Sequence, residues 1–142
     1  MNDAFGIIVV GDEILNGRRQ DRHFEAIGGL LRERGFAVAW LRILPDDPEC
    51  LVTEFSRSMA DGIPVFCCGG IGATPDDHTR ACAARAAGVP LGMHPGAVAE
   101  IEARFPIGKL RPLMAGKPRA QGEDGNTPFV QRIPGALFCS IF

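Results

Sequence analysis

Short apolar runs alternate with longer amphipathic segments along the N-terminal part of the chain. The runs are rich in Val, Ile, Leu and Phe, which is typical of strands buried on both faces of a parallel sheet. The segments between them carry apolar residues at helical spacing or many alanines, which favours helices. The alternation predicts an α/β fold with a mostly parallel sheet and right-handed crossovers. The predicted strands are residues 5–10, 37–44 and 63–66, and the predicted helices are residues 22–34, 48–61 and 80–87.

The first predicted strand is the most apolar, so we expect it to lie centrally in the sheet. In the helix that follows, Asp21 can cap the N-terminus and Gly35 can end the C-terminus. Gly28 and Gly29 inside this helix each cost about 1 kcal/mol relative to alanine, which we attribute to close packing against the sheet. The expected apolar face of the helix consists of Phe24, Ile27, Leu30 and Leu31.

A pair of acidic residues follows each predicted strand. Ligands of parallel α/β sheets bind beyond the carboxyl ends of the strands, and all three pairs fall at that edge. One pair alone is more often a helix cap or a solvated turn, but three pairs at one edge indicate a binding site. The pairs are Asp12-Glu13, Asp46-Asp47 and Asp76-Asp77.

A glycine-rich turn separates the third predicted strand from its helix, in the order Gly69-Gly70-Ile71-Gly72. Thr74 can cap that helix and Pro75 suits its first position, which places Asp76 and Asp77 in the first turn. Such a turn can hold phosphate on backbone N–H groups, although a tight turn and ordinary capping explain the same residues. Carboxylates repel phosphate unless a cation lies between them, and Mg²⁺ prefers such oxygen ligands. We therefore predict a phosphate site assisted by Mg²⁺ or another divalent metal.

The amino-acid composition limits the kinds of molecule that the protein can bind and the compartment in which it can work. The chain has 142 residues, 46% of them hydrophobic, which suits one domain with one core. Its net charge is −2 and its only lysines are Lys109 and Lys117, so we expect no broad nucleic-acid binding. The five cysteines are odd in number and have no C-x-x-C spacing, which favours free thiols in a reducing compartment. We expect a cytoplasmic protein without a membrane span, because the first apolar run is too short for one.

The pattern changes after a predicted helix at about residues 95–105. From about residue 106, Gly and Pro recur every few positions, which predicts irregular structure or short strands. Residues 136–142 are apolar again and can form a last strand. If this strand lies at an edge, we expect a homo-oligomer, a dimer or trimer, with the segment in or near the interface. The alternative is that it closes the chain's own core. The interface candidates are Leu137, Phe138, Ile141 and Phe142.

Three motifs together resemble the molybdopterin-binding domain family of the MoaB/Mog type, most closely its CinA-like branch. The resemblance covers roughly residues 5–105 and implies a single three-layer α/β/α domain with its ligand over the glycine-rich turn. It also implies that Asp77 and Asp46 are the functional acidic residues, near the metal and the phosphates. The motifs are Gly11-Asp12-Glu13-Ile14-Leu15-x-Gly17, Pro45-Asp46-Asp47 and Gly69-Gly70-Ile71-Gly72-x-Thr74-x-Asp76-Asp77-x-Thr79.

The resemblance implies a small phosphate-bearing ligand, molybdopterin or an adenine nucleotide. Some members of the family transfer adenylyl from MgATP to molybdopterin, and some in the CinA-like branch hydrolyse nucleotide diphosphates such as ADP-ribose. The alternative is a non-catalytic binding or regulatory module that has lost part of the site. The expected catalytic residues are Asp77 and Asp46; the expected ligand-binding residues are Gly69, Gly70, Ile71, Gly72, Thr74 and Thr79; and the expected metal-binding residues are Asp77, Asp76, Asp12 and Glu13.

Overall fold

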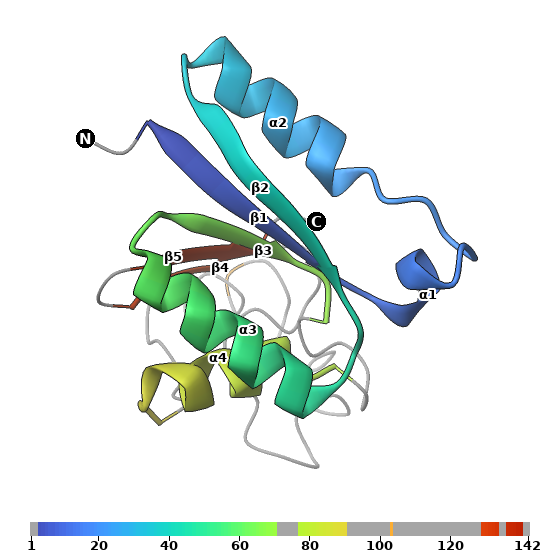
Figure 1. The fold of residues 1–142 in the computed structure, drawn as a ribbon, viewed down its shortest axis with the longest axis vertical. Helices are drawn as coiled ribbons and strands as arrows, with labels where there is room; N and C mark the ends of the chain where they lie inside the picture. Colours follow the sequence, from blue (N-terminus) through green and yellow to red (C-terminus); the bar gives the residue numbers. More distant parts are fainter. Residues whose placement is uncertain (1–2, 71–76, 91–102, 104–128, 134–135, 141–142) are drawn as a thin grey trace.

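A single five-stranded sheet organises the fold (Figure 1). The structure is a computed structural model, and it describes residues 3–70, 77–90, 103, 129–133 and 136–140. The strand order is β2-β1-β3-β5-β4, and only the β4–β5 pair is antiparallel. The mostly parallel α/β sheet predicted from the sequence is therefore confirmed. The strands are β1 (Ala4–Val10), β2 (Ala37–Leu44), β3 (Val65–Cys68), β4 (Phe129–Ile133) and β5 (Ala136–Ser140).

Helices cover both faces of the sheet and complete the three layers. Helix α2 lies over one face, and α3 and α4 lie side by side over the other (Figure 1). Alternate residues of β1 serve the two faces: Ile7 and Val9 pack toward α2, whereas Ile8 and Val10 pack toward α3 and α4. The helices are α1 (Asp12–Leu15), α2 (His23–Glu33), α3 (Pro48–Asp61) and α4 (Thr79–Ala87).

Strand β1 is paired on both sides, with β2 and with β3, and its residues 6–10 are all buried. Strand β1 therefore lies inside the sheet, in agreement with the prediction that the first strand is central. The middle strand of the five is nevertheless β3, because β5 and β4 extend the sheet beyond it.

Three boundaries differ from those predicted. Residues 12–15 form a short helix rather than an open turn. Strand β3 begins at Val65 and runs on through Cys68, two residues beyond the predicted end. Helix α4 begins only at Thr79, so Asp77 lies before the helix and not in its first turn. The predicted cap at Thr74 and Pro75 lies outside the described residues, as does the helix predicted at residues 95–105 apart from Ala103, which is helical.

Helix α2 confirms its predicted cap but not its predicted apolar face. The Asp21 carboxylate accepts hydrogen bonds from the backbone N–H groups of His23 and Phe24, both at 3.0 Å. Ile27 and Leu31 are buried as expected. Phe24 and Leu30 are each 41% exposed, so their assignment to the core is wrong. Only the stripe that faces the sheet is covered, and these two side chains lie outside it.

The close-packing explanation for the two glycines of α2 is also wrong. A Cβ at Gly28 would meet Arg32 at 3.5 Å and Val38 at 3.9 Å, which are ordinary contacts. A Cβ at Gly29 would enter open space. The backbone at both positions is helical, so alanine fits without strain.

Replacing Gly29 with alanine is therefore expected to stabilise the protein by about 0.5–1 kcal/mol, because alanine loses less backbone entropy in a helix. The control is Gly62→Ala, at the end of α3, where the space is also open but φ is +70°. That variant is expected to lose about 1 kcal/mol, because a side chain disfavours the left-handed region. Urea unfolding of both variants measures the difference, and a Gly29→Ala variant less stable than wild type contradicts the explanation.

The C-terminal strand lies within the sheet and not at its edge. Strand β5 pairs in parallel with β3, through Val65 and Phe66, and antiparallel with β4. The predicted C-terminal interface required residues 136–142 to form an edge strand. Residues 136–140 do not meet this condition, because β5 has a partner strand on each side. The alternative, a segment that completes its own sheet, agrees with the structure.

Candidate functional site

Two of the acidic turns interlock at the carboxyl edge of the sheet. The backbone N–H of Asp12 donates to Oδ2 of Asp46, and the backbone N–H of Asp46 donates to Oδ1 of Asp12, each at 3.2 Å. Just before them, the Gly11 N–H donates to the Leu44 carbonyl at 3.0 Å. These reciprocal bonds hold the turns after β1 and β2 together and orient the Asp46 carboxylate.

Strand register explains this pairing, and the sequence held a signal for it. Val10 is the register partner of Leu44, and each aspartate follows its strand by the same two-residue offset. Equal offsets after neighbouring parallel strands place residues side by side at one edge. The sequence analysis placed both acids at that edge but did not identify them as direct partners.

The glycine-rich turn crosses directly over the end of β1. Gly69 and Gly70 have φ values of +88° and +59°, in the left-handed region that glycine tolerates. A Cβ at Gly69 would collide with the carbonyl oxygen of Val10. A Cβ at Gly70 would collide with the Thr79 hydroxyl and lie 3.3 Å from Oδ1 of Asp46. Gly70 therefore lets the turn pack directly against the Thr79 hydroxyl, close to the Asp46 carboxylate.

Thr79, the first residue of α4, fixes the other side of this turn. Its backbone N–H donates to the Gly70 carbonyl and its hydroxyl donates to the Gly69 carbonyl, both at 2.9 Å. The residue is buried, with 6% of its surface exposed. Its hydroxyl proton is thus committed to the turn, which gives Thr79 a role in shaping the predicted phosphate cradle.

Asp46 is the electrostatically unusual residue of the site. Its Oδ1 atom is buried and has no hydrogen-bond partner within the described part of the chain. Burial raises the pKa of Asp46 above its ordinary value, and the hydrogen bond from the Asp12 backbone opposes that shift. The negative charges of three further acids raise the pKa as well; they are Asp12, Glu13 and Asp77.

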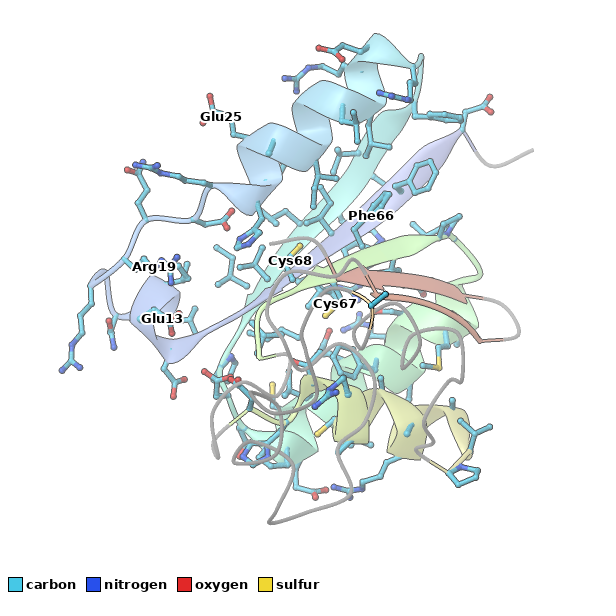
Figure 2. All side chains as sticks on the ribbon, turned by 180° about the vertical axis from the view of Figure 1, so that it is seen from behind. Glu13, Arg19, Glu25, Phe66, Cys67 and Cys68 are labelled. Atoms are coloured by element: carbon cyan, nitrogen blue, oxygen red, sulfur yellow. The ribbon has the colours of Figure 1, made fainter. Side chains whose placement is uncertain are left out.

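Asp46 therefore shares one electrostatic neighbourhood with Asp12, Glu13 and Asp77, but these acids do not form a finished metal cage. Among the residues that the structure describes, no three His, Cys, Asp or Glu side chains lie close enough together to hold a metal ion. Glu13, on α1 (Figure 2), folds back so that its Oε2 lies 2.9 Å from the position of a Cβ on Gly11. The remaining predicted site residues lie outside the described ranges; they are Ile71, Gly72, Thr74 and Asp76.

The donor set nevertheless suits a hard cation. A buried carboxylate oxygen without a donor is poorly solvated, and a divalent cation or a proton satisfies it. Oxygen ligands with few nitrogen or sulfur atoms nearby are what Mg²⁺ prefers. Asp46 is therefore the residue of this site that fits the predicted metal best.

Comparison of the sequence with known proteins identifies the family to which the chain belongs. A family model described as a probable molybdopterin binding domain matches residues 6–136. The chain belongs to this family. The resemblance drawn from the three motifs is thereby confirmed.

Relatives of this molybdopterin-binding family are similar over most of the chain. A CinA-like protein of Geobacter sp. (strain M21) is 36% identical over 108 residues, which cover 75% of this chain and 26% of the relative. A CinA-like protein of Koribacter versatilis (strain Ellin345) is 32% identical over 131 residues, which cover 86% of this chain and 32% of the relative. The chain thus spans about a quarter to a third of the length of these relatives.

Solved structures share the fold of this family member. CinA from Thermoplasma acidophilum, a protein of unknown function, superposes with a TM-score of 0.72 at 22% identity, over 97% of this chain and 86% of its own. The molybdopterin biosynthesis enzyme MoaB from Thermus thermophilus superposes with a TM-score of 0.63 at 23% identity, over 96% of this chain and 79% of its own. At these identities the likeness is one of fold.

The structure also addresses two broader expectations from the sequence, on the cysteines and on a membrane span. Cys50, Cys67, Cys68 and Cys82 are free thiols, as the spacing of the cysteines predicted. In the described ranges, no helix is both long enough and apolar enough to cross a membrane.

Proposed function

We propose that the chain binds a phosphate-bearing pterin or nucleotide over the Gly69-Gly70 turn, together with Mg²⁺ or a similar divalent ion. The observation that carries the proposal is the buried Oδ1 of Asp46, which has no hydrogen-bond partner among the described residues. It lies 3.3 Å from the position that a Cβ on Gly70 would take, so the glycine lets the turn pass close to this oxygen. A bound cation would satisfy this oxygen and would place positive charge next to the glycine-rich turn.

Asp46 and Asp77 would hold the ion, and Asp12 would keep Asp46 in place through the reciprocal backbone bonds. Gly69 and Gly70 would let the backbone approach the phosphates closely, because no side chain stands between them. When bound, the ion supplies positive charge between the carboxylates and the phosphate oxygens, which lowers their mutual repulsion. Asp76, Ile71, Gly72 and Thr74 are proposed for the same site on the motif alone, and Glu13 as a further ligand or base.

This arrangement supports phosphate chemistry of the kind implied by the resemblance. Transfer of adenylyl to molybdopterin and hydrolysis of a nucleotide diphosphate both need close positioning and charge neutralisation more than a strong nucleophile on the protein. The free thiols agree with a reducing, cytoplasmic setting for such an activity.

A second candidate function is a binding module without catalysis. It is favoured by one observation: within the part of the chain that the structure describes, fewer than three metal-ligand side chains come together. A site with too few ligands can bind a pterin phosphate on backbone N–H groups and still lack turnover. The two candidates therefore differ in whether binding depends on the metal.

Calorimetry of the chain with ATP, ADP-ribose and a molybdopterin analogue, each with and without Mg²⁺, tests the proposal. Metal-dependent binding of one of these ligands is the expected result. Binding that is equally tight with and without Mg²⁺ supports the module instead, and no binding of any ligand overturns both candidates. Turnover assays on ATP plus molybdopterin and on ADP-ribose then separate an enzyme from a metal-dependent binder.

A further inference from the structure

Helix α4 holds the glycine-rich turn through a single residue, Thr79. The Thr79 hydroxyl donates to the Gly69 carbonyl and the Thr79 backbone N–H donates to the Gly70 carbonyl, both at 2.9 Å. Two consecutive carbonyl groups of the turn therefore point to the first residue of α4. Because Thr79 is buried, both hydrogen bonds lie in a medium of low polarity, which strengthens them.

The direction of the Gly69 carbonyl sets the direction of a backbone donor. A trans peptide unit is planar, so its C=O and N–H groups point to opposite sides. The Gly69 carbonyl and the Gly70 N–H belong to one such unit, and none of the described peptide bonds is cis. Because the carbonyl points to the Thr79 hydroxyl, the Gly70 N–H points away from it. No acceptor among the described residues takes this N–H group.

The turn is enclosed between the end of β1 and the beginning of α4. A side chain at Gly69 would collide with the Val10 carbonyl oxygen, and a side chain at Gly70 would collide with the Thr79 hydroxyl. A Cβ at Gly70 would also lie 3.3 Å from Oδ1 of Asp46, the oxygen proposed to hold the ion. The oriented N–H group of Gly70 therefore lies close to the proposed ion ligand.

We infer that Thr79 is a positioning residue of the proposed phosphate site, and that the group it positions is the Gly70 N–H. This role rests on the proposed function, because it requires an anionic ligand over the turn. The Thr79 hydroxyl has one proton, which it donates to the Gly69 carbonyl and not to the ligand. Thr79 acts through the turn, so that the Gly70 N–H can donate to a phosphate oxygen without first reorienting.

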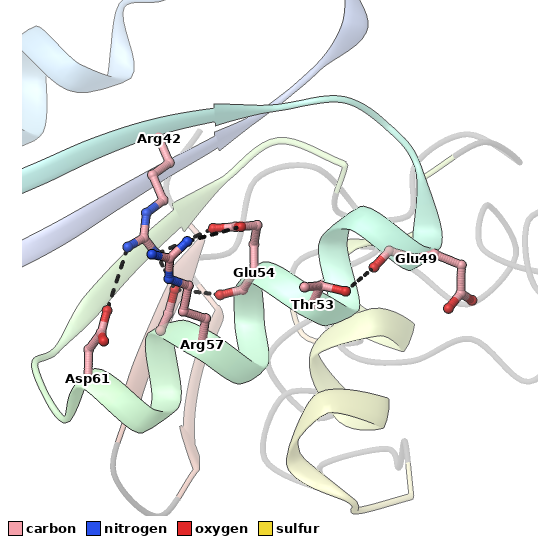
Figure 3. Close-up of polar contacts among 7 residues, drawn as sticks. Arg42, Glu49, Thr53, Glu54, Arg57 and Asp61 are labelled. Carbon is pink, nitrogen blue, oxygen red and sulfur yellow. Dashed lines mark hydrogen bonds and ion pairs between the residues drawn. The ribbon is translucent and has the colours of Figure 1, made fainter.

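Thr53 provides a matched control for the loss of a threonine hydroxyl. Its hydroxyl donates to the Glu49 carbonyl at 2.8 Å (Figure 3). This hydrogen bond is of the same chemical kind as the bond from Thr79 to Gly69, but both of its residues belong to α3. Thr53→Val therefore reports the cost of losing such a bond away from the turn.

Replacing Thr79 with valine removes the hydroxyl at nearly constant volume and leaves the Gly69 carbonyl without its donor. Thr79→Val is expected to weaken Mg²⁺-dependent binding at least about tenfold, roughly the value of one hydrogen bond to a charged group. Thr79→Ser keeps the hydroxyl and is expected to bind nearly as the wild type does, and Thr53→Val is expected to bind unchanged. Calorimetry with ATP, ADP-ribose and a molybdopterin analogue, each with Mg²⁺, measures the affinities.

The backbone amide signal of Gly70 in nuclear magnetic resonance spectra reports on the positioned donor itself. In the wild type, saturating ligand with Mg²⁺ is expected to shift this signal. In Thr79→Val the shift at saturation is expected to be lost, which a residue that only stabilises the fold would not cause. Circular dichroism verifies that each variant folds, and Thr79→Ala serves if Thr79→Val does not fold.

The possible outcomes separate this role from the proposed function. A wild type that binds none of the three ligands, or binds without a shift of the Gly70 signal, overturns the proposed function and the role of Thr79 with it. A wild type that binds with the shift, together with a Thr79→Val variant of equal affinity, overturns the role of Thr79 alone. Equal losses in Thr79→Val and Thr79→Ser also overturn it, because serine keeps the hydroxyl.

Discussion

Replacing Asp46 with asparagine is expected to abolish Mg²⁺-dependent ligand binding and at the same time to stabilise the ligand-free protein. Changes one shell away from a metal typically weaken its binding by about 10–100-fold, so loss of Asp46, the proposed direct ligand, is expected to weaken Mg²⁺ binding by at least about 100-fold. The gain in stability arises because asparagine removes a partly buried negative charge, which burial disfavours and which three neighbouring acids also repel; they are Asp12, Glu13 and Asp77.

The dependence of stability on pH has a definite sign at Asp46. Its pKa is raised in the folded protein, above about 3.9 in an unfolded chain, so the folded state holds this proton more tightly. The free energy of unfolding therefore falls as the pH rises from the unfolded pKa through the folded one, and it stays lower above that window. In the asparagine variant this fall is absent. Urea unfolding across the acid range, without metal, measures the difference.

The matched control for Asp46→Asn is Asp47→Asn. Asp47 is the next residue, it is exposed, and its carboxylate caps α3 by accepting a hydrogen bond from the Cys50 N–H at 2.8 Å. Asparagine caps a helix about as well, so this variant is expected to keep both stability and binding. Addition of Mg²⁺ and ligand should raise the melting temperature of the control but not of Asp46→Asn. An Asp46→Asn variant that binds with Mg²⁺ as the wild type does contradicts the site.

Replacing Gly69 with alanine is expected to destabilise the protein by at least about 3 kcal/mol, which combines left-handed strain with a steric clash. The strain follows from the φ of +88°, and the clash is with the Val10 carbonyl oxygen, a backbone atom inside the sheet that cannot swing aside. For a domain of this size the loss corresponds to a fall in melting temperature of roughly 10 °C.

The control for Gly69 is Gly88, which ends α4. Its φ of +66° is also left-handed, but a Cβ there would enter open space. Gly88→Ala is expected to lose only about 1–2 kcal/mol, from the backbone strain alone. Thermal unfolding of both variants separates the cost of the backbone strain from the cost of the steric clash with Val10. Equal losses would mean that the turn is not held against Val10 as the structure has it.

The alternation of β1, α2, β2, α3, β3 and α4, and the edge of the sheet at which the proposed site lies, followed from the sequence alone. Continuous apolar runs that alternate with amphipathic segments can be buried only as a parallel sheet between helices, and parallel strands bring their carboxyl ends to one edge. Local signals also sufficed for helix ends: Asp21 caps α2 as predicted, and α3 spans the predicted residues 48–61. These features depend on neighbours within a few residues, which a sequence displays directly.

Contacts between segments far apart in the chain determined the features that the sequence did not predict. Helical spacing put Phe24 and Leu30 on the apolar side of α2, but which part of that side meets the sheet depends on how the helix docks, and both remained exposed. The first residue of α4 is Thr79, which bonds back across the turn to Gly69 and Gly70, a contact that local cap signals do not contain. The position of β5 between β3 and β4 is likewise a pairing of strands far apart in the chain.

The site itself shows the same division. The sequence determined that Asp12 and Asp46 reach the carboxyl edge, because each follows a strand by two residues. Only the register of β1 against β2 set Asp12 and Asp46 into reciprocal hydrogen bonds. Only the folded chain enclosed Oδ1 of Asp46 without a donor among the described residues and raised its pKa. Burial and electrostatic repulsion arise from distances in space, and a linear pattern of residues does not contain them.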